Sequence, residues 1–563
     1  MAYIDDTAPV GAALAPLEIP ARQSRRLLLC GLLFAFIFAG LFGRDPWKPD
    51  EAYTMGIVHH IVRTGEWVVP RLAGEPFMEK PPLFYVTAAA FAKAFSGMLS
   101  EHDAARLAIA LYVGLTLLFV SLAAATLYGR ERALGCAIVL VGSLGYVVPA
   151  HLLFTDQALL AGLAMALYGL AHALRRPMRA GVFVGSGAGI AFMAKGLLGP
   201  GLVALVALVL GLLPAWRSRG YAASLGIALL AFAPWALLWP SLLYCESPAL
   251  FHEWFVVNNL GRFAGWARIG PQANHLVYLE VLPWFAIPAL PLAAAHFWSA
   301  RRERLWLRPE VQLPLVCAGA MLLVLSASCT AREVYALPFF LPLCLLAVAR
   351  PLTLSPAVSA CLRSLAISLG SALALALWLA WLAFIVRWPA PLIERLGAAA
   401  PGFVPALQAG TAVLALAATA GWIALVRATS KSDDALLIAW AASVVLPWTL
   451  MMTIWLPYLD YGNSYRGLVA QIKSSLPAHV TCFANRRLGE PQRAMLDYFG
   501  GLITDRDSTP AGARCPLLLV QSLHTPEELA RHGPWKLLWS GARPGDGKEH
   551  FWLLLRVESR RRG

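Results

Sequence analysis

The chain has 563 residues, of which 59% are hydrophobic and only 14% are charged, and its mean hydropathy is +0.63. A soluble globular domain has roughly 45–50% apolar and about 25% charged residues, so this composition excludes a single soluble globule. The net charge of +14 does not by itself indicate a nucleic-acid partner, because lysine and arginine also orient membrane proteins.

The chain begins with a polar segment that ends in a cluster of arginines and continues into an apolar run at 27–43. About 20 apolar residues cross the hydrocarbon core of a bilayer as a helix, so this run predicts a first transmembrane helix. A cleaved signal peptide is the alternative. The acidic residues Asp5 and Asp6 and the lack of a clear small-residue cleavage site favour the retained helix.

Twelve further apolar runs follow, which brings the predicted count of transmembrane helices to thirteen. They lie at 104–128, 133–150, 157–174, 180–194, 198–214, 221–244, 281–298, 311–327, 335–349, 364–387, 409–427 and 435–456. The sequence therefore predicts a polytopic α-helical membrane protein.

Basic residues gather on every second connection between these runs. They are Arg130, Arg132, Arg175, Arg176, Arg179, Arg217, Arg219, Arg301, Arg302, Arg304, Arg308, Arg350, Arg363, Arg427 and Lys431. Because positive loops stay in the cytoplasm, this pattern predicts a cytoplasmic N-terminus and an outer, periplasmic or extracellular, position for everything after residue 456. The predicted membrane domain is 1–456, and its longest outer loops are 44–103 and 245–280.

The outer segment 457–563 is polar and long enough for a small domain of its own. The predicted strands lie at 479–484, 516–521, 535–539 and 551–557, and the predicted helices lie at 490–499 and 525–532. This order predicts a small soluble α/β domain. Cys482 and Cys515 head two of the adjacent strands, so a disulfide and a pair of free thiols are both open.

An acidic pair, Asp50 and Glu51, stands just after the first predicted span. Ionisable groups at a membrane boundary are functional candidates, although such a pair also caps helices. Apolar residues at helical spacing over 52–64 predict an amphipathic helix that lies in the membrane interface.

The same loop contains Glu79 and Lys80 directly before the prolines Pro81 and Pro82. Two consecutive prolines prevent a regular helix before them, so the two charged side chains are expected to be presented together at a bend. A lysine there suits a phosphate, and a glutamate suits a metal ion or an amine.

These motifs, in this order, resemble the GT-C membrane glycosyltransferases that use polyprenyl-phosphate sugars. The resemblance rests on the acidic pair, the Glu79–Leu83 motif, Thr155–Gln157, Met193–Gly196, Asn258–Phe263, His275–Trp284, Ser326–Pro338 and Gly489–Phe499. The chain is most similar to the bacterial aminoarabinose transferases and more distantly to the protein O-mannosyltransferases. The resemblance implies a GT-C fold with about 13 transmembrane helices and periplasmic interfacial helices.

The resemblance also implies a role for each matching residue. Asp50 would be the catalytic carboxylate, with Lys80, Arg262 and Tyr335 around the donor phosphate. Further substrate contacts would come from Glu51, Asp156, Lys195 and Arg268, and a divalent metal such as zinc would be held by Glu79 and His275. No nucleotide cofactor is expected.

Simpler interpretations of several of these residues stay open. Arg262 and Arg268 fit headgroup contacts, and His275 fits an interfacial hydrogen bond. Asp156 and Lys195 fit an ion pair with each other or helix caps, and Tyr335 fits an aromatic belt.

The chain departs from the family pattern at two places. Ala52, Tyr53 and Thr54 follow the acidic pair where the family has an arginine, so one substrate contact is missing or is supplied elsewhere. Arg332 stands where the family has a lysine, which preserves the charge but not the geometry.

The activity that the resemblance implies is transfer of 4-amino-4-deoxy-L-arabinose from undecaprenyl phosphate to lipid A, which gives resistance to polymyxin and cationic antimicrobial peptides. A related transferase with another sugar or acceptor is the first alternative. A lipid or polysaccharide transporter is less consistent, because no internal repeat is present. The expected protein is a monomer in the bacterial inner membrane, with no nucleic-acid partner.

Overall fold

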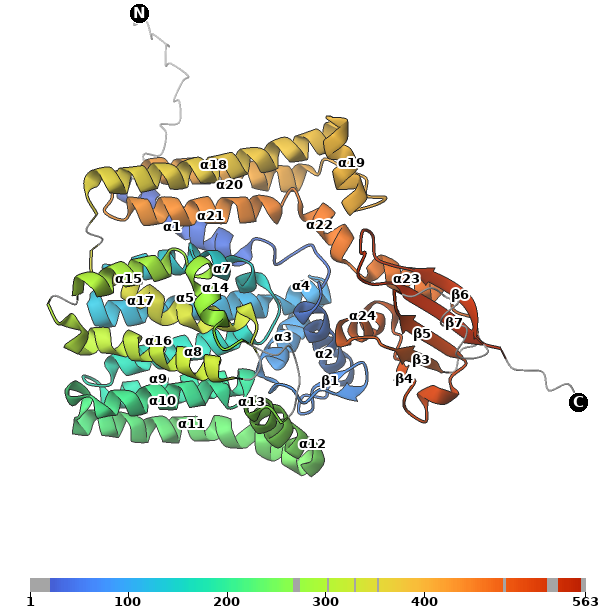
Figure 1. The fold of residues 1–563 in the computed structure, drawn as a ribbon, viewed down its shortest axis with the longest axis horizontal. Helices are drawn as coiled ribbons and strands as arrows, with labels where there is room; N and C mark the ends of the chain where they lie inside the picture. Colours follow the sequence, from blue (N-terminus) through green and yellow to red (C-terminus); the bar gives the residue numbers. More distant parts are fainter. Residues whose placement is uncertain are drawn as a thin grey trace, which may run out of the picture.

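A computed structural model describes residues 21–266, 274–300, 303–328, 331–351, 354–478, 482–523 and 535–557. Long helices lie side by side in one body, and a mixed sheet protrudes from one end of that body (Figure 1). The polytopic helical class and the small C-terminal α/β region predicted from the sequence are therefore confirmed.

All thirteen predicted apolar runs contain helix. The helices are α1 (Ala21–Phe38), α5 (Leu107–Tyr128), α6 (Arg132–Val141) with α7 (Leu144–Val147), α8 (Asp156–His172), α9 (Pro177–Lys195), α10 (Leu198–Leu212), α11 (Arg219–Glu246), α14 (Val277–Phe285) with α15 (Ala289–Ala300), α16 (Pro309–Ala327), α17 (Phe340–Val348), α18 (Pro356–Val386), α20 (Ala409–Ala428) and α21 (Ala435–Met451).

Not every one of these helices is long enough to cross a bilayer alone. Within the described ranges, five helices meet the length and composition of a span, and eight do so when each of three bent pairs counts as one. The bends, between 63° and 97°, break runs that look continuous in the sequence. The count of thirteen crossings stays a prediction.

Shorter elements occupy the connections. They are α2 (Asp50–Thr64), β1 (Arg71–Leu72), β2 (Glu75–Pro76), α3 (Leu83–Ala94), α4 (Glu101–Ala105), η1 (Pro149–His151), η2 (Pro214–Trp216), α12 (Pro248–His252), the π-helix η3 (Glu253–Gly261), α13 (Arg262–Ala264), η4 (Leu305–Leu307), η5 (Glu333–Phe339), α19 (Ala390–Ala399) and α22 (Leu456–Asn463). The α2, α3, α4, α12 and α13 labels gather at the end of the bundle that faces the sheet (Figure 1).

A buried charge cluster fixes the start of α2. Glu51 is 1% exposed and accepts hydrogen bonds from the guanidinium groups of Arg44, at 2.8 Å for the Nη2–Oε1 pair, and Arg106, at 3.4 Å. The backbone N–H of Leu153, just before α8, also donates to Glu51 at 3.1 Å. Burial opposes ionisation, but the two guanidinium groups lower the pKa of Glu51 to about 2.

The C-terminal domain is built on one five-stranded sheet with the order β4-β3-β5-β7-β6. Its elements are α23 (Arg466–Ser474), β3 (Phe483–Arg486), α24 (Glu490–Gly500), β4 (Asp505–Arg506), η6 (Gly512–Arg514), β5 (Leu517–Gln521), β6 (Trp535–Gly541) and β7 (Phe551–Arg556). Strand β3 is parallel to β4 and β5, whereas β5, β7 and β6 are antiparallel neighbours.

Most of the elements predicted for this domain are confirmed. Strands β5, β6 and β7 and helix α24 lie where the sequence predicted them, and β3 begins at Phe483, near the end of the predicted run. The two-residue strand β4 was not predicted, because two residues are too few to show an alternating pattern. The helix predicted at 525–532 lies outside the described residues.

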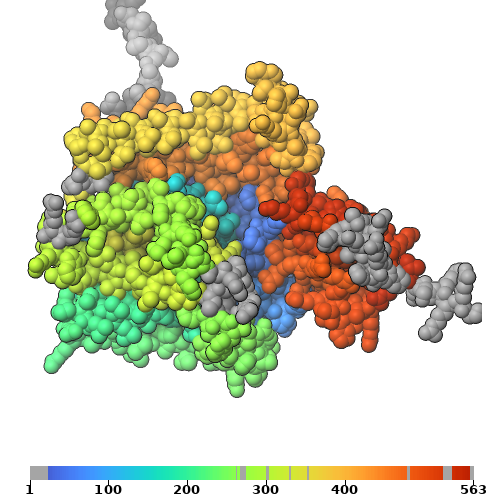
Figure 2. All heavy atoms as spheres, in the orientation of Figure 1, coloured from blue at the N-terminus to red at the C-terminus, as the bar shows by residue number. Residues whose placement is uncertain are grey.

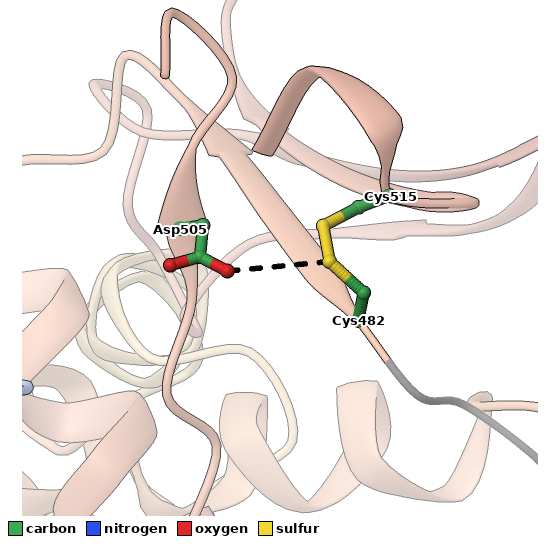
Figure 3. Close-up of side chains that lie close together, drawn as sticks. All are labelled: Cys482, Asp505 and Cys515. Carbon is green, nitrogen blue, oxygen red and sulfur yellow. Dashed lines mark hydrogen bonds between the residues drawn. A yellow bond between two sulfur atoms is a disulfide. The ribbon is translucent and has the colours of Figure 1, made fainter. Parts of the chain in front are cut away.

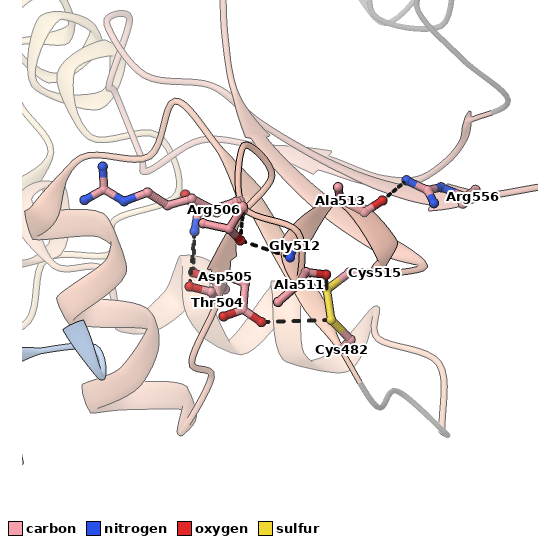
Figure 4. The surroundings of a disulfide bond; sticks show 11 residues. Cys482, Thr504, Asp505, Arg506, Ala511, Gly512, Ala513, Cys515 and Arg556 are labelled. Carbon is pink, nitrogen blue, oxygen red and sulfur yellow. Dashed lines mark hydrogen bonds between the residues drawn. A yellow bond between two sulfur atoms is a disulfide. The ribbon is translucent and has the colours of Figure 1, made fainter.

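Cys482 and Cys515 form a disulfide with a Cα–Cα distance of 5.0 Å. The two cysteines precede the paired parallel strands β3 and β5, as Figure 4 shows with the surrounding turn. Of the two alternatives that the sequence left open, the structure has the disulfide.

The C-terminal domain packs directly on α2. A Cβ atom added to Gly56 would lie 2.6 Å from Cβ of Ala494 on α24, so a glycine is required for this close approach. Eleven of the fifteen residues of α2, from Asp50 to Ile61, are buried. The helix predicted at 52–64 is therefore confirmed, but it is enclosed between α3 and α24 instead of lying open in the interface. Figure 2 shows the blue N-terminal atoms in contact with the orange and red domain.

Ion pairs surround this contact. Arg63 on α2 donates to Asp497 on α24 at 2.9 Å. Glu75 in the β1–β2 hairpin accepts from Arg493 at 2.9 Å and from Arg506 at 3.0 Å. Arg63 and Glu75 belong to the loop 44–103, and their partners belong to the C-terminal domain. These ion pairs therefore hold the loop against the domain.

We expect Glu51→Gln to destabilise the protein by about 3 kcal/mol, because it leaves the buried guanidinium of Arg44 without its carboxylate partner and leaves Arg106 with Asp103 alone. Thermal unfolding of the purified protein in detergent measures this. Glu394→Gln makes the same chemical change at an exposed position on α19 and should leave the transition unchanged. Equal unfolding temperatures for the two variants would contradict a structural role for Glu51.

Candidate functional site

Two parts of the chain that are far apart in the sequence, the loop 44–103 and the connection after α16, bring charged side chains together at the sheet-facing end of the bundle. Asp50 lies in the first turn of α2, and Lys80 lies at the bend just before Pro81 and Pro82. Arg332 precedes η5 on the connection that follows α16. Helix α3 begins directly after the two prolines, so Lys80 lies in the loop before the helix, as the sequence predicted.

Asp50 is held by two partners. The guanidinium of Arg332 donates to both carboxylate oxygens, at 2.8 and 3.3 Å, and the hydroxyl of Tyr53 donates at 3.0 Å. Burial opposes ionisation of Asp50, but Arg332, Lys80 and Tyr53 favour its charged form and lower its pKa below 3.8. Asp50 is therefore an ionised, oriented carboxylate and a weak proton acceptor at neutral pH.

Lys80 reaches the same cluster from the other side. Its ammonium donates to the hydroxyl oxygen of Tyr53 at 2.5 Å and lies 5.0 Å from the centre of the Tyr53 ring. Desolvation lowers the pKa of Lys80 below 10.5, although the neighbouring charge of Asp156 opposes this effect.

A second ion pair lies beside the first. Lys195, at the end of α9, contacts Asp156 at 2.5 Å, and its ammonium lies 4.0 Å from the centre of the Tyr335 ring. Asp156 and Lys195 therefore pair with each other, which was one of the alternatives from the sequence. The structure brings Tyr335 to this pair.

A cavity of about 550 Å³ opens next to these cations. Its polar lining is Glu79, Lys80, Lys195, Asn258, Asn259, Ser328 and Tyr335. Its other walls are mainly apolar and include Leu197, Leu198, Leu202, Leu260, Phe263, Trp266, Val324 and Leu325. Two lysines in the lining of a mainly apolar cavity suit a ligand that carries a phosphate on a hydrocarbon chain.

The other predicted site residues lie in different surroundings. Glu51 belongs to the buried cluster with Arg44 and Arg106 and does not line the cavity. Arg262 begins α13, but its side chain is not among the described ones, and Arg268 lies outside the described residues. Their roles stay predictions.

The predicted metal ligands do not form a complete site. Glu79 lines the cavity, whereas His275 is tied by its Nδ1 to the carbonyl oxygen of Ser326 at 2.6 Å. In the described ranges, three metal-binding side chains come within 4.8 Å of one another only at Cys482, Asp505 and Cys515. Those two cysteines are joined by the disulfide (Figure 3), so this group does not fit a metal either.

Three residues of the site were not predicted as site residues. Tyr53 and Arg332 were noted only as departures from the family pattern, although both bind Asp50. Asn259 accepts from the backbone N–H of Leu197 at 3.0 Å and so joins η3 to the start of α10. The alternation of loop charge was the available signal for Arg332, because it placed that residue on the same outer face as Asp50.

Comparisons with known proteins agree with this arrangement. The family model described as dolichyl-phosphate-mannose-protein mannosyltransferase matches residues 79–239. The undecaprenyl phosphate-alpha-4-amino-4-deoxy-L-arabinose arabinosyl transferase 1 of Sodalis glossinidius is 33% identical over 341 residues, 57% of this chain and 58% of that relative. The corresponding transferase of Pseudomonas aeruginosa is 29% identical over 359 residues, 58% of this chain and 59% of that relative. The matched segments thus span less than two thirds of these relatives.

Solved structures share the fold over nearly the whole chain. The crystal structure of ArnT from Cupriavidus metallidurans in the apo state has a TM-score of 0.68 at 19% identity and covers 95% of this chain and 98% of its own. The form bound to undecaprenyl phosphate has a TM-score of 0.66 at 20% identity, with the same coverage. The resemblance to the aminoarabinose transferases and the GT-C fold class are therefore confirmed.

We expect the affinity of the cavity for a lipid phosphate to fall as the pH rises. The fall should begin at a lower pH than it would if Lys80 had the pKa of an ordinary lysine. The lowered pKa means that Lys80 loses its charge at a less alkaline pH than an ordinary lysine does. One charge-assisted contact is worth about 1.5–3 kcal/mol, so the loss is roughly tenfold to a hundredfold in affinity.

Binding of undecaprenyl phosphate, measured by native mass spectrometry from neutral to alkaline pH, tests the expectation. Lys80→Arg keeps its charge and should bind with little pH dependence. Lys93→Arg, on the exposed face of α3, is the matched control and should follow the wild type. A wild-type affinity that does not change with pH would contradict the role of Lys80.

Proposed function

We propose that this protein is an inner-membrane glycosyltransferase that moves 4-amino-4-deoxy-L-arabinose from undecaprenyl phosphate to a phosphate of lipid A on the periplasmic face. The observation that carries the proposal is the mainly apolar cavity lined by Lys80 and Lys195, with Lys80 linked through the Tyr53 hydroxyl to the carboxylate of Asp50. The cellular consequence would be resistance to polymyxin and other cationic antimicrobial peptides.

The donor fits this cavity by its two chemical parts. The apolar walls formed by α10, η3 and α16 suit the polyprenyl chain, and Phe263 and Trp266 are exposed next to them, at 49% and 75%. The donor phosphate would lie against Lys80 and Lys195, with Tyr335 beside them. A lipid-linked donor makes a nucleotide cofactor unnecessary.

The transfer would proceed by substitution at the anomeric carbon. A phosphate oxygen of lipid A attacks that carbon and forms the new bond, and the bond from the same carbon to the donor phosphate oxygen breaks with its electron pair. Undecaprenyl phosphate leaves with one additional negative charge. Lys80 and Lys195 are placed to stabilise this charge, which is greater in the transition state than in the bound donor.

Asp50 would orient the reactants instead of removing a proton. Its lowered pKa and its contact with Arg332 make it a weak base. A lipid A phosphate is already ionised at neutral pH and needs no general base. The proposed acceptor is therefore consistent with an Asp50 that is a weak base.

The proposed orientation in the membrane rests on the arginines of alternate connections, because positive loops stay in the cytoplasm. The sheet and the candidate site share the other end of the helices (Figure 1). We infer a cytoplasmic N-terminus and a periplasmic C-terminal domain, and the monomer expected from the sequence is part of the same proposal.

An O-mannosyltransferase-like activity on a hydroxyl acceptor is the second candidate, because the mannosyltransferase model matches 79–239. A hydroxyl must lose its proton during attack, and that step favours a base with a pKa near the working pH. The Asp50–Arg332 pair is less suited to this role.

Mass spectrometry of lipid A tests the proposal in a host that makes the lipid-linked donor but lacks its own transferase. Wild type should add one aminopentose to lipid A, and Asp50→Ala should lose at least about 99% of the product because an oriented charge in the site is removed. Asp433→Ala changes an exposed carboxylate on the α20–α21 connection and should retain the product.

Absence of the aminopentose with well-expressed wild type would reject lipid A as the acceptor. Hexose on periplasmic proteins of the same cells would then favour the O-mannosyltransferase-like activity.

A further inference from the structure

A single hydroxyl joins the two charged groups that the proposed reaction uses. The ammonium of Lys80 donates to the oxygen of Tyr53 at 2.5 Å, and the hydroxyl of Tyr53 donates to Asp50 at 3.0 Å. Arg332 completes the series by donating to the other carboxylate oxygen of Asp50 at 2.8 Å. The order is cation, hydroxyl, carboxylate, cation.

The chemistry of these groups determines where each proton lies. An ammonium can only donate, so the oxygen of Tyr53 must accept from Lys80. An ionised carboxylate can only accept, so the hydroxyl proton of Tyr53 must point to Asp50. No other arrangement of the hydroxyl satisfies both neighbours, and its orientation is therefore unique.

Packing holds the Tyr53 ring in place independently of these bonds. Tyr53 is 7% exposed, and its ring stacks on Phe77 with centroids 5.5 Å apart. The ring lies one turn along α2 from Asp50, on a helix that the Glu51 cluster and α24 both anchor. The hydroxyl is thus presented from a rigid support to the Lys80 ammonium and the Asp50 carboxylate.

We propose that Tyr53 is a positioning residue of the transfer reaction, and that its hydroxyl holds the Lys80 ammonium and the Asp50 carboxylate in one fixed relative orientation. The inference rests on the proposed function and adds a residue to it. In this arrangement the group that binds the donor phosphate and the carboxylate beside the reacting sugar move as one unit. Neither side chain then has to be ordered again when the donor arrives.

Tyr53→Phe tests the proposal, because it removes one oxygen atom and preserves the stacked ring. The first measurement is the affinity for undecaprenyl phosphate alone, by native mass spectrometry, which does not depend on sugar transfer. We expect a loss of about tenfold, the usual size for one charge-assisted hydrogen bond. Tyr128→Phe removes a hydroxyl that donates to the carbonyl oxygen of Glu310 at 2.9 Å, far from the site, and should bind as wild type does.

The second measurement is the kinetics of transfer with varied donor. A positioning role raises the KM for the donor and lowers kcat in Tyr53→Phe, with an unchanged unfolding temperature. A merely structural role lowers the amount of active protein, so the apparent kcat falls and KM stays at the wild-type value.

The two measurements separate this proposal from the proposed function. Wild-type binding of undecaprenyl phosphate without aminoarabinose transfer would reject the function, and a weaker affinity in Tyr53→Phe would still support the positioning role. An unchanged affinity in Tyr53→Phe, or an unchanged KM in a variant with reduced turnover, would overturn that role.

Discussion

The buried charge of Glu51 is the constraint on which the sheet-facing end of the helical body depends. A carboxylate that is 1% exposed is tolerated only because two guanidinium groups and two backbone N–H groups surround it. These partners come from the segment after α1, from the start of α5 and from the residues before α8, so one charge ties three parts of the membrane body together. Asp50, the preceding residue, owes its place to this anchor.

The two neighbouring carboxylates have opposite tasks for a geometric reason. Adjacent positions on a helix differ by about 100° in direction, so the side chains of Asp50 and Glu51 point to different surroundings. Glu51 points into the protein, where Arg44 and Arg106 balance its charge. Asp50 points toward the cations at the cavity, where a bound ligand could compete for Arg332 and Lys80. In the acidic pair, Glu51 is thus a structural residue and Asp50 is the candidate functional residue.

Much of this could be predicted from the sequence, and the rest depended on contacts that a sequence does not display. Apolar length located the helices, and strand patterns located β5, β6 and β7, since both signals are local. The bends of up to 97° were hidden because a break of a few residues leaves the hydropathy unchanged. The Arg332–Asp50 pair joins residues 282 positions apart, and only the fold decides which arginine of the outer loops meets which carboxylate. The same limit explains why Glu51 was predicted as a substrate contact, whereas in the structure it lies in the buried cluster with Arg44 and Arg106.

The apolar walls of the cavity have a consequence for how affinity is expressed. A ligand whose hydrocarbon part stays in the bilayer reaches Phe263 and Trp266 by diffusion in two dimensions, so its occupancy follows its mole fraction among the surrounding lipids and not its concentration in water. Detergent alkyl chains can occupy the same walls. Purification in micelles therefore replaces a competition among lipids with a competition against the solubilising agent itself, and dissociation constants from the two environments belong to different equilibria.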